Sequence, residues 1–173
     1  SQGEMWNFMR LGRLLERADK TSRILDVKYY VLLPSTDDIG SPLDAVQWTA
    51  LLDSTSALTM YRRRYGVIVP NQVAEFLILD RAFPRSIYHC VTGAERAVHD
   101  ITGVSTDYYS NPAEQYLGKL RYELTFTGIE DIIAQGIHEF VDSIQIRLNQ
   151  ISEETHNTFF SRPSQQQTQM QVQ

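Results

Sequence analysis

The chain has 173 residues, of which 42% are hydrophobic and 21% are charged, a balance that suits one globular domain with a substantial apolar interior. Its formal net charge of −5 argues against a general nucleic-acid-binding protein, whose binding face is normally basic. No apolar run is long enough to cross a bilayer and no signal-peptide pattern opens the sequence. We therefore expect a cytoplasmic protein with neither a membrane nor a nucleic acid as partner.

Hydrophobic periodicity predicts an all-α protein, an antiparallel bundle of about six helices, two of them long. The first helix covers residues 4–33 and ends before Pro34, because the residue that precedes a proline is disfavoured in a helix. A loop rich in proline, serine and aspartate follows at residues 34–42. The second helix covers residues 43–65, with arginines in its last turn and Gly66 as its predicted C-cap.

The second part of the chain continues the helical pattern. Pro70 opens a short third helix, and Pro84 opens a fourth that ends near residue 101. After a loop, a fifth helix begins near residue 113 and ends before Gly128. The sixth, long helix is predicted to run without a break over residues 129–160, along one apolar seam formed by Ile133, Ile137, Phe140, Ile144, Leu148 and Ile151.

The end of the chain has a different composition. Residues 162–173 are rich in glutamine and have no apolar face, so we expect them to be a disordered tail. The predicted domain accordingly covers residues 1–161.

Charged residues are dense on the first helix and form the first candidate site, a binding or structural cluster. Helical phase places Glu16 on the row of Met5 and Met9, which predicts that Glu16 borders the core with Arg23 as its nearest partner. Arg17 is predicted to lie on a more exposed ridge unless another helix covers it. Such charges either form a structural lattice between helices or line a site, and we favour the lattice slightly. The cluster consists of Arg13, Glu16, Arg17, Asp19, Arg23 and Asp26.

A second group of cations is a candidate anion-binding site. Arg62, Arg63 and Arg64 are consecutive, and Arg85 and Ser86 follow Pro84 near a predicted helix start. Guanidinium groups and the first N–H groups of a helix both suit a phosphate or a carboxylate. The alternative, which we favour for the arginine run, is helix capping and solubility.

Other chemistry-bearing residues give weaker signals. The single cysteine, Cys90, lies in a helical apolar stripe, and we interpret it as a small buried hydrophobe in a reducing compartment. The four histidines are scattered, and His138-Glu139 has no second histidine at helical spacing. We therefore predict no metal, no cofactor and no catalytic residue.

Several motifs, in order, resemble the bacterial alpha-E domain family, a helical family named for a Glu-Arg motif. The resemblance extends over residues 5–160 and is closest to the C-terminal half of family members, which are commonly about twice as long. It implies that this chain is part of a longer protein or is covered by another chain. The matching segments are residues 11–19 (LGRLLERAD) with Thr21, Arg23 and residues 25–27, then residues 61–65 (YRRRY), 73–77 (VAEFL), 80–86 (DRAFPRS) and 138–140 (HEF).

The resemblance also implies a functional context. Genes of the family commonly lie beside those of an ATP-grasp protein and a transglutaminase-like protein. The chain is therefore expected to be a non-catalytic accessory or interaction module of a peptide-ligating system, with the ATP-grasp-type ligase or another operon-encoded protein as partner. Two alternatives stay open: an enzyme or binding domain that uses Glu16 and the arginines on an anionic peptide-like substrate, and a self-associating scaffold or homo-oligomer.

Overall fold

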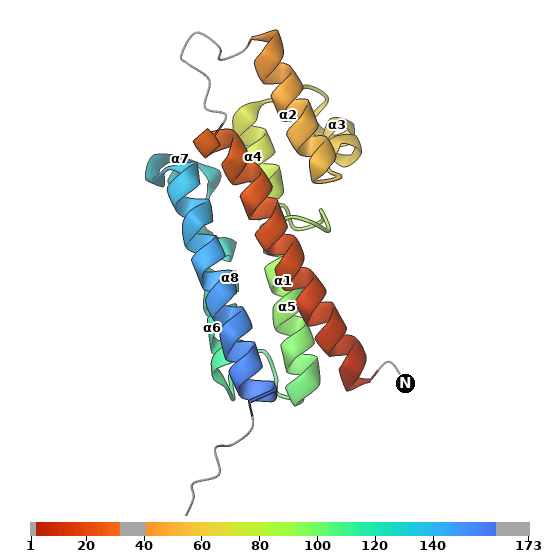
Figure 1. Cartoon of the computed structure of the whole chain (residues 1–173), viewed down its shortest axis with the longest axis vertical. Coiled ribbons are helices and arrows are strands. Elements are labelled where there is room, and N and C mark those ends of the chain that lie inside the picture. The colour runs from red at the N-terminus through yellow and green to blue at the C-terminus, as the bar shows by residue number, and fades with distance from the viewer. Residues whose placement is uncertain (1–2, 32–40, 162–173) are drawn as a thin grey trace, which may run out of the picture.

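The computed structural model describes residues 3–31 and 41–161. Pro34, most of the predicted loop and the predicted glutamine-rich tail lie outside these residues. The described chain is entirely helical, with no strand, which confirms the all-α prediction (Figure 1). Its elements are α1 (Glu4–Asp26), the π-helix η1 (Val27–Val31), α2 (Pro42–Ser54), α3 (Leu58–Tyr65), α4 (Pro70–Leu79), α5 (Ile87–Thr102), α6 (Pro112–Phe126), α7 (Ile129–Gln135) and α8 (Ile137–Phe159).

The described part has more helices than the predicted six because two predicted helices are broken. The helix expected over residues 43–65 is divided into α2 and α3 at Ser56, whose φ of 55° is left-handed and ends a helix. The helix expected over residues 129–160 is divided into α7 and α8 at Gly136, whose φ of 102° strongly favours glycine. Apolar residues continue at helical spacing across both breaks, so periodicity alone did not reveal them.

Helices α1, α5, α6 and α8 form an antiparallel bundle, in which α1 contacts α5 and α8, and α6 contacts the same two helices (Figure 1). Helices α2, α3, α4 and α7 lie at the end of the bundle where α1 ends and α8 begins. The core includes Leu11, Leu14 and Leu25 of α1, all of them buried. The α1–α5 contact is close: a Cβ built on Gly93 would lie 2.9 Å from Leu14 Cδ1.

The π-helix η1 buries a cation that the sequence prediction did not single out. Lys28 is 4% exposed, and its Nζ lies 2.6 Å from Asp44 Oδ1 and 2.7 Å from Gln47 Oε1, both on α2. The ammonium group also lies 5.1 Å from the centre of the Trp48 ring. Because a buried charge requires partners, this cluster fixes α2 against the end of α1.

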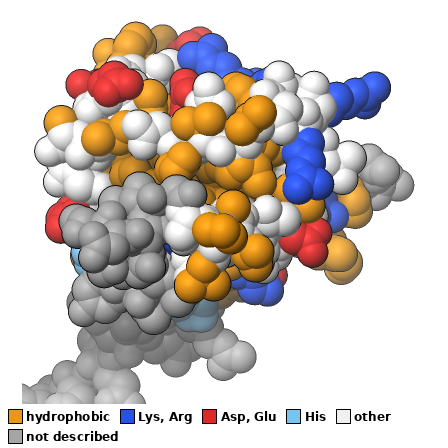
Figure 2. Space-filling view, turned by 90° about the horizontal axis from the view of Figure 1, so that it is seen from above, with side chains coloured by type: hydrophobic (Ala, Val, Ile, Leu, Met, Phe, Trp, Pro, Cys, Tyr) orange, Lys and Arg blue, Asp and Glu red, His pale blue; other side chains and the backbone are white. Residues whose placement is uncertain are grey.

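Viewed from that end, hydrophobic side chains are exposed on the surface among scattered charged groups (Figure 2). Leu43 and Val46 of α2 are both more than half exposed, and Val27 of η1 is 46% exposed. No helix in the described ranges is both long and apolar enough to cross a membrane.

Candidate functional site

Glu16 and Arg17 lie on different sides of α1, as predicted, but Glu16 is the more exposed of the two. Glu16 is exposed and forms an ion pair with Lys20, with the charged atoms 2.6 Å apart, so the expected pair with Arg23 is wrong. Arg23 instead lies 2.8 Å from Asp19, which is one turn away. Both are surface pairs within one helix, each stabilising by roughly 0.2–0.5 kcal/mol.

Arg17 is half-buried, because α5 covers its side of α1. Burial raises the pKa of the Cys90 thiol on α5 to about 11, and the positive charge of Arg17 opposes that rise, which places the guanidinium near the thiol. Arg13, by contrast, is exposed and lies over the Trp6 ring, 5.8 Å from its centre. Arg17 was expected on the more exposed ridge unless another helix covers it, and α5 covers it here.

Asp26, the last member of the predicted cluster, connects α1 to α8. Its Oδ1 lies 2.6 Å from Nδ1 of His138. The hydrogen bond to Asp26 raises the pKa of His138 above its ordinary value of 6.5, with further contributions from the charges of Asp26, Glu139 and Asp142. The predicted lattice thus has one member that crosses between helices.

A groove of about 400 Å³ lies between α1 and α8, and we call it the α1–α8 groove. Glu16 and Asp19 are on its wall, and Gly12 leaves open space there, since a Cβ at that position would meet nothing within 4 Å. Met5 and Met9 continue the row of Glu16 and are 79% and 62% exposed. The rest of the lining is mainly apolar and comprises Phe8, Leu11, Leu15, Leu148, Asn149, Ser152, Thr155 and Phe160.

The candidate anion site is partly occupied by a carboxylate of the chain itself. Arg64 forms an ion pair with Asp80, whose side chain is 8% exposed. Ser86 is the N-cap of α5: its hydroxyl accepts from the N–H of His89 and donates to the carbonyl oxygen of Asp80. The carbonyl oxygen of Arg85 accepts from the Thr21 hydroxyl at 2.8 Å. Arg62 and Arg63 are exposed, and an anion-binding role for the group stays a prediction.

The α5–α6 contact contains a second Glu-Arg dipeptide, Glu95-Arg96, which the sequence reasoning missed although the repeated pair was visible. The Glu95 side chain is 4% exposed and lies 2.6 Å from the Arg121 guanidinium of α6. A Cβ on Gly118 would lie 3.5 Å from Glu95 Oε1, so glycine leaves room for the carboxylate.

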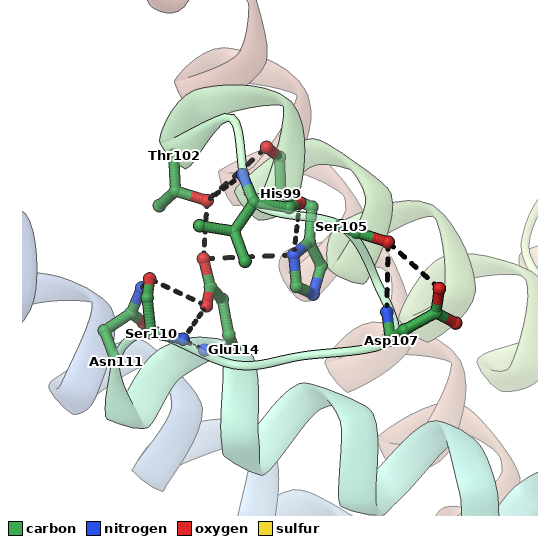
Figure 3. Close-up of polar contacts among 8 residues, drawn as sticks. His99, Thr102, Ser105, Asp107, Ser110, Asn111 and Glu114 are labelled. Carbon is green, nitrogen blue, oxygen red and sulfur yellow. Dashed lines mark hydrogen bonds and ion pairs between the residues drawn. The ribbon is translucent and has the colours of Figure 1, made fainter.

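A second cluster of polar residues surrounds Glu114 of α6, beside His99, which lies one turn after Glu95 on α5 (Figure 3). Its carboxylate accepts from the Thr102 hydroxyl at 2.5 Å and from the main chain and hydroxyl of Ser110, and it lies 3.9 Å from His99 Nδ1. Burial alone would raise the pKa of Glu114, but these hydrogen bonds favour the ionised form and the pKa is lowered overall. No short motif joins these residues in the sequence.

Two further predictions concern reactive groups. Cys90 is fully buried and free, as expected, and a thiol with a pKa of about 11 is inert at neutral pH. Among the residues that the structure describes, no three His, Cys, Asp or Glu side chains gather in an arrangement that would hold a metal ion.

Comparison with protein families supplies the assignment that the geometry lacks. The model of Alpha-E, described as a predicted alpha-helical domain with a conserved ER motif, matches residues 1–160. The chain belongs to the Alpha-E family. Neither the curated proteins nor the solved structures contain a match to it. In this Alpha-E chain the Glu-Arg pair occurs at residues 16–17 and at residues 95–96. Glu16 of the first pair is exposed, and Glu95 of the second pair is buried.

Proposed function

We propose that this Alpha-E chain is a non-catalytic accessory module that binds a partner enzyme through the α1–α8 groove. The partner is an ATP-grasp-type peptide ligase, the class implied by the family resemblance. The observation that supports the proposal most directly is an apolar groove together with two exposed methionines, Met5 and Met9, which lie on the same row of α1 as its lining residues Gly12 and Glu16. Methionine is flexible and polarisable, so a methionine-lined surface adapts well to an apolar partner.

The charges support binding rather than catalysis. Glu16, on the groove wall, is held by Lys20, and Asp19 is held by Arg23, so these carboxylates are already in surface ion pairs. The cysteine thiol is buried and protonated. A groove of this kind suits an amphipathic helix, whose apolar side chains would fill the space beside Gly12.

The groove also has the right length for a helical segment. The α1 residues that line the groove run from Phe8 to Asp19, which is about three turns, or roughly 17 Å at 1.5 Å per residue. A helix of the partner with apolar residues every third or fourth position would contact the row along this whole length. The partner's segment should therefore be apolar on one side and of helical character.

The test is a binding assay between the purified chain and an ATP-grasp-type peptide ligase from its own host. Met9→Lys, in the row that borders the groove, should weaken binding at least tenfold, because it places a charge on an apolar surface. Val67→Lys is the matched control, since Val67 is 73% exposed and far along the chain in the α3–α4 connection. Circular dichroism checks that both variants keep their helical content.

The alternatives give different results in the same samples. If the ligase binds both variants as tightly as the unaltered chain, the groove is not its docking site. If no complex forms with the ligase and light scattering shows a dimer that Met9→Lys dissociates, the groove joins two copies of this chain and the ligase proposal is wrong.

A further inference from the structure

A second pocket, of about 400 Å³, lies between α5, α6 and the loop that connects them, and we call it the α5–α6 pocket. The loop contributes Tyr108 and Tyr109, which are 73% and 63% exposed and stand at its edge. Buried Glu95, His99 and Glu114 line it from the helices. The proposed docking groove is formed by α1 and α8 instead, so this pocket requires an explanation of its own.

One of the residues that line the pocket is His99, which is 6% exposed. Figure 3 shows its imidazole beside Glu114 and the loop after α5. Its Nδ1 lies 3.0 Å from the carbonyl oxygen of Val104. Because a carbonyl only accepts, Nδ1 carries a proton, and the Nδ1–H tautomer presents Nε2 as an acceptor. Nε2 makes no hydrogen bond to any residue that the structure describes. A nine-tenths buried side chain thus offers an unused acceptor at a pocket wall.

The charges around this acceptor favour a positive ligand. Four carboxylates line the pocket, those of Glu95, Asp107, Glu114 and Glu123, against two permanent cations, Lys119 and Arg121. The Glu95–Arg121 pair neutralises one carboxylate and the Arg147–Glu123 pair a second, which leaves Asp107 and Glu114, kept ionised by its hydrogen bonds, against Lys119. The remaining excess is negative in a partly enclosed space, where electrostatic attraction is stronger than in open water.

The two exposed tyrosines add the other element of cation recognition. Tyrosine rings attract an ammonium group placed over their faces, and the effect grows when the group is partly desolvated. We propose that the α5–α6 pocket binds a primary ammonium group, which donates a hydrogen bond to His99 Nε2 and lies between the carboxylates and the rings of Tyr108 and Tyr109. The ligand is a small aliphatic amine or the amino terminus of a short peptide.

The experiment is a titration followed by NMR chemical shifts of the ¹⁵N-labelled chain. The probes are cadaverine and an alanine tripeptide amide with a free amino terminus. The N-acetylated tripeptide and butyrate are the matched controls, because neither carries an ammonium group. The expected result is saturable shifts of residues 99, 106–109 and 114–119 with one or both ammonium probes, and none there with the controls.

The two ammonium probes distinguish the sources of the ligand. Tighter binding of cadaverine indicates a free amine, and tighter binding of the tripeptide indicates a peptide terminus. No shifts with either probe at its solubility limit would overturn the proposal, as would equal shifts with the acetylated peptide or stronger shifts with butyrate.

Three variants test the assigned contacts. Replacing both tyrosines, Tyr108→Ala with Tyr109→Ala, should weaken binding about fivefold, as expected for loss of two exposed cation–π contacts. Lys119→Ala should strengthen binding about twofold, because it removes a like charge from the wall. His99→Phe should abolish the site-specific shifts while keeping a ring in the cavity. If His99→Phe does not fold, the tyrosine and lysine variants still decide the proposal.

A matched control lies on the same helix. Phe126 of α6 is 70% exposed and is outside the pocket lining, so Phe126→Ala should leave the affinity unchanged. Equal weakening by Phe126→Ala and by the tyrosine double variant would mean that the probes bind the apolar surface of α6, and the pocket assignment would be wrong. This result would leave the proposed ligase docking untouched, because that depends on the α1–α8 groove.

Discussion

The same dipeptide, Glu-Arg, occurs in opposite environments on α1 and on α5. On α1, Glu16 is exposed and its ion pair with Lys20 lies within one helix. On α5, Glu95 is buried and pairs across to Arg121 of α6. The difference follows from helical phase: the positions facing a neighbouring helix on α1 are occupied by leucine and alanine, whereas on α5 Glu95 itself occupies such a position.

This contrast separates two roles that a charged motif can have. A buried acid paired across an interface holds helices in register, and its loss leaves a guanidinium without a partner. An exposed acid paired within its own helix, such as Glu16 on the groove wall, contributes little to folding. Substitutions in the α5–α6 contact should therefore lower the stability of the fold, whereas substitutions in the α1–α8 groove should weaken binding of the partner.

The largest expected effect is that of Glu95→Gln. Arg121 would lose its buried counter-charge, and since Arg121 is 32% exposed and partly hydrated, we expect a loss of about 2–3 kcal/mol in the free energy of unfolding. Glu16→Gln is the matched control, and it should cost less than about 0.5 kcal/mol. Urea unfolding measures both. Equal losses would show that the two motifs do not differ in their structural role.

The second effect compares two glycines. Gly93→Ala places a Cβ 2.9 Å from Leu14 Cδ1 in the α1–α5 contact, so Leu14 must move. Overpacking costs about 1–3 kcal/mol, offset by about 0.5–1 kcal/mol from the higher helix propensity of alanine, which gives a net loss near 1 kcal/mol. Thermal unfolding checks the sign. An increase in stability would mean that Leu14 relocates freely and the contact is loosely packed.

Gly12→Ala should have the opposite sign. Nothing lies within 4 Å of the added Cβ, so only helix propensity changes, and the chain should gain about 0.5–1 kcal/mol. The new methyl group faces the α1–α8 groove, and partner binding should weaken while stability rises. If binding is unchanged in the same preparation, the ligase does not approach the wall at Gly12.

The sequence predicts much of this architecture because its signals are local. The leucine stripe of α1, the proline at the start of α4 and Pro84 before α5 each act within one or two turns. Gly136 escaped prediction because an apolar seam continues through it, and only its positive φ shows the break. A periodic pattern reports which face is buried, not whether the backbone is continuous.

The candidate sites were less predictable, for a related reason. Met5 and Met9 suggested a core row that included Glu16, yet both methionines are exposed and the row borders a groove. His99 and Glu114 lie on different helices and belong to no short motif, so only the packing of α5 against α6 brings them together. Glu95-Arg96 was the one available signal, because it repeats the dipeptide of α1.

The smallest expected effect is the pH dependence of the free energy of unfolding that comes from the Asp26–His138 contact. Asp26 raises the pKa of His138 above 6.5, so folding favours the protonated imidazole. This contribution is fully present below about pH 6.5 and is lost as the pH rises through the folded-state pKa. The Glu95–Arg121 pair joins α5 to α6 and does not involve His138, so it should not share this dependence.

Asp26→Asn should therefore flatten the decline in unfolding free energy between about pH 6 and pH 8, whereas Glu16→Gln should keep the slope of the unaltered chain. Urea midpoints across this range measure the slope, and NMR titration of the His138 ring should show its pKa falling in Asp26→Asn. An unchanged His138 pKa would contradict the link between α1 and α8. If Glu95→Gln flattened the slope to the same extent, the pH dependence could not be assigned to the α1–α8 contact, because a substitution between α5 and α6 would have the same effect.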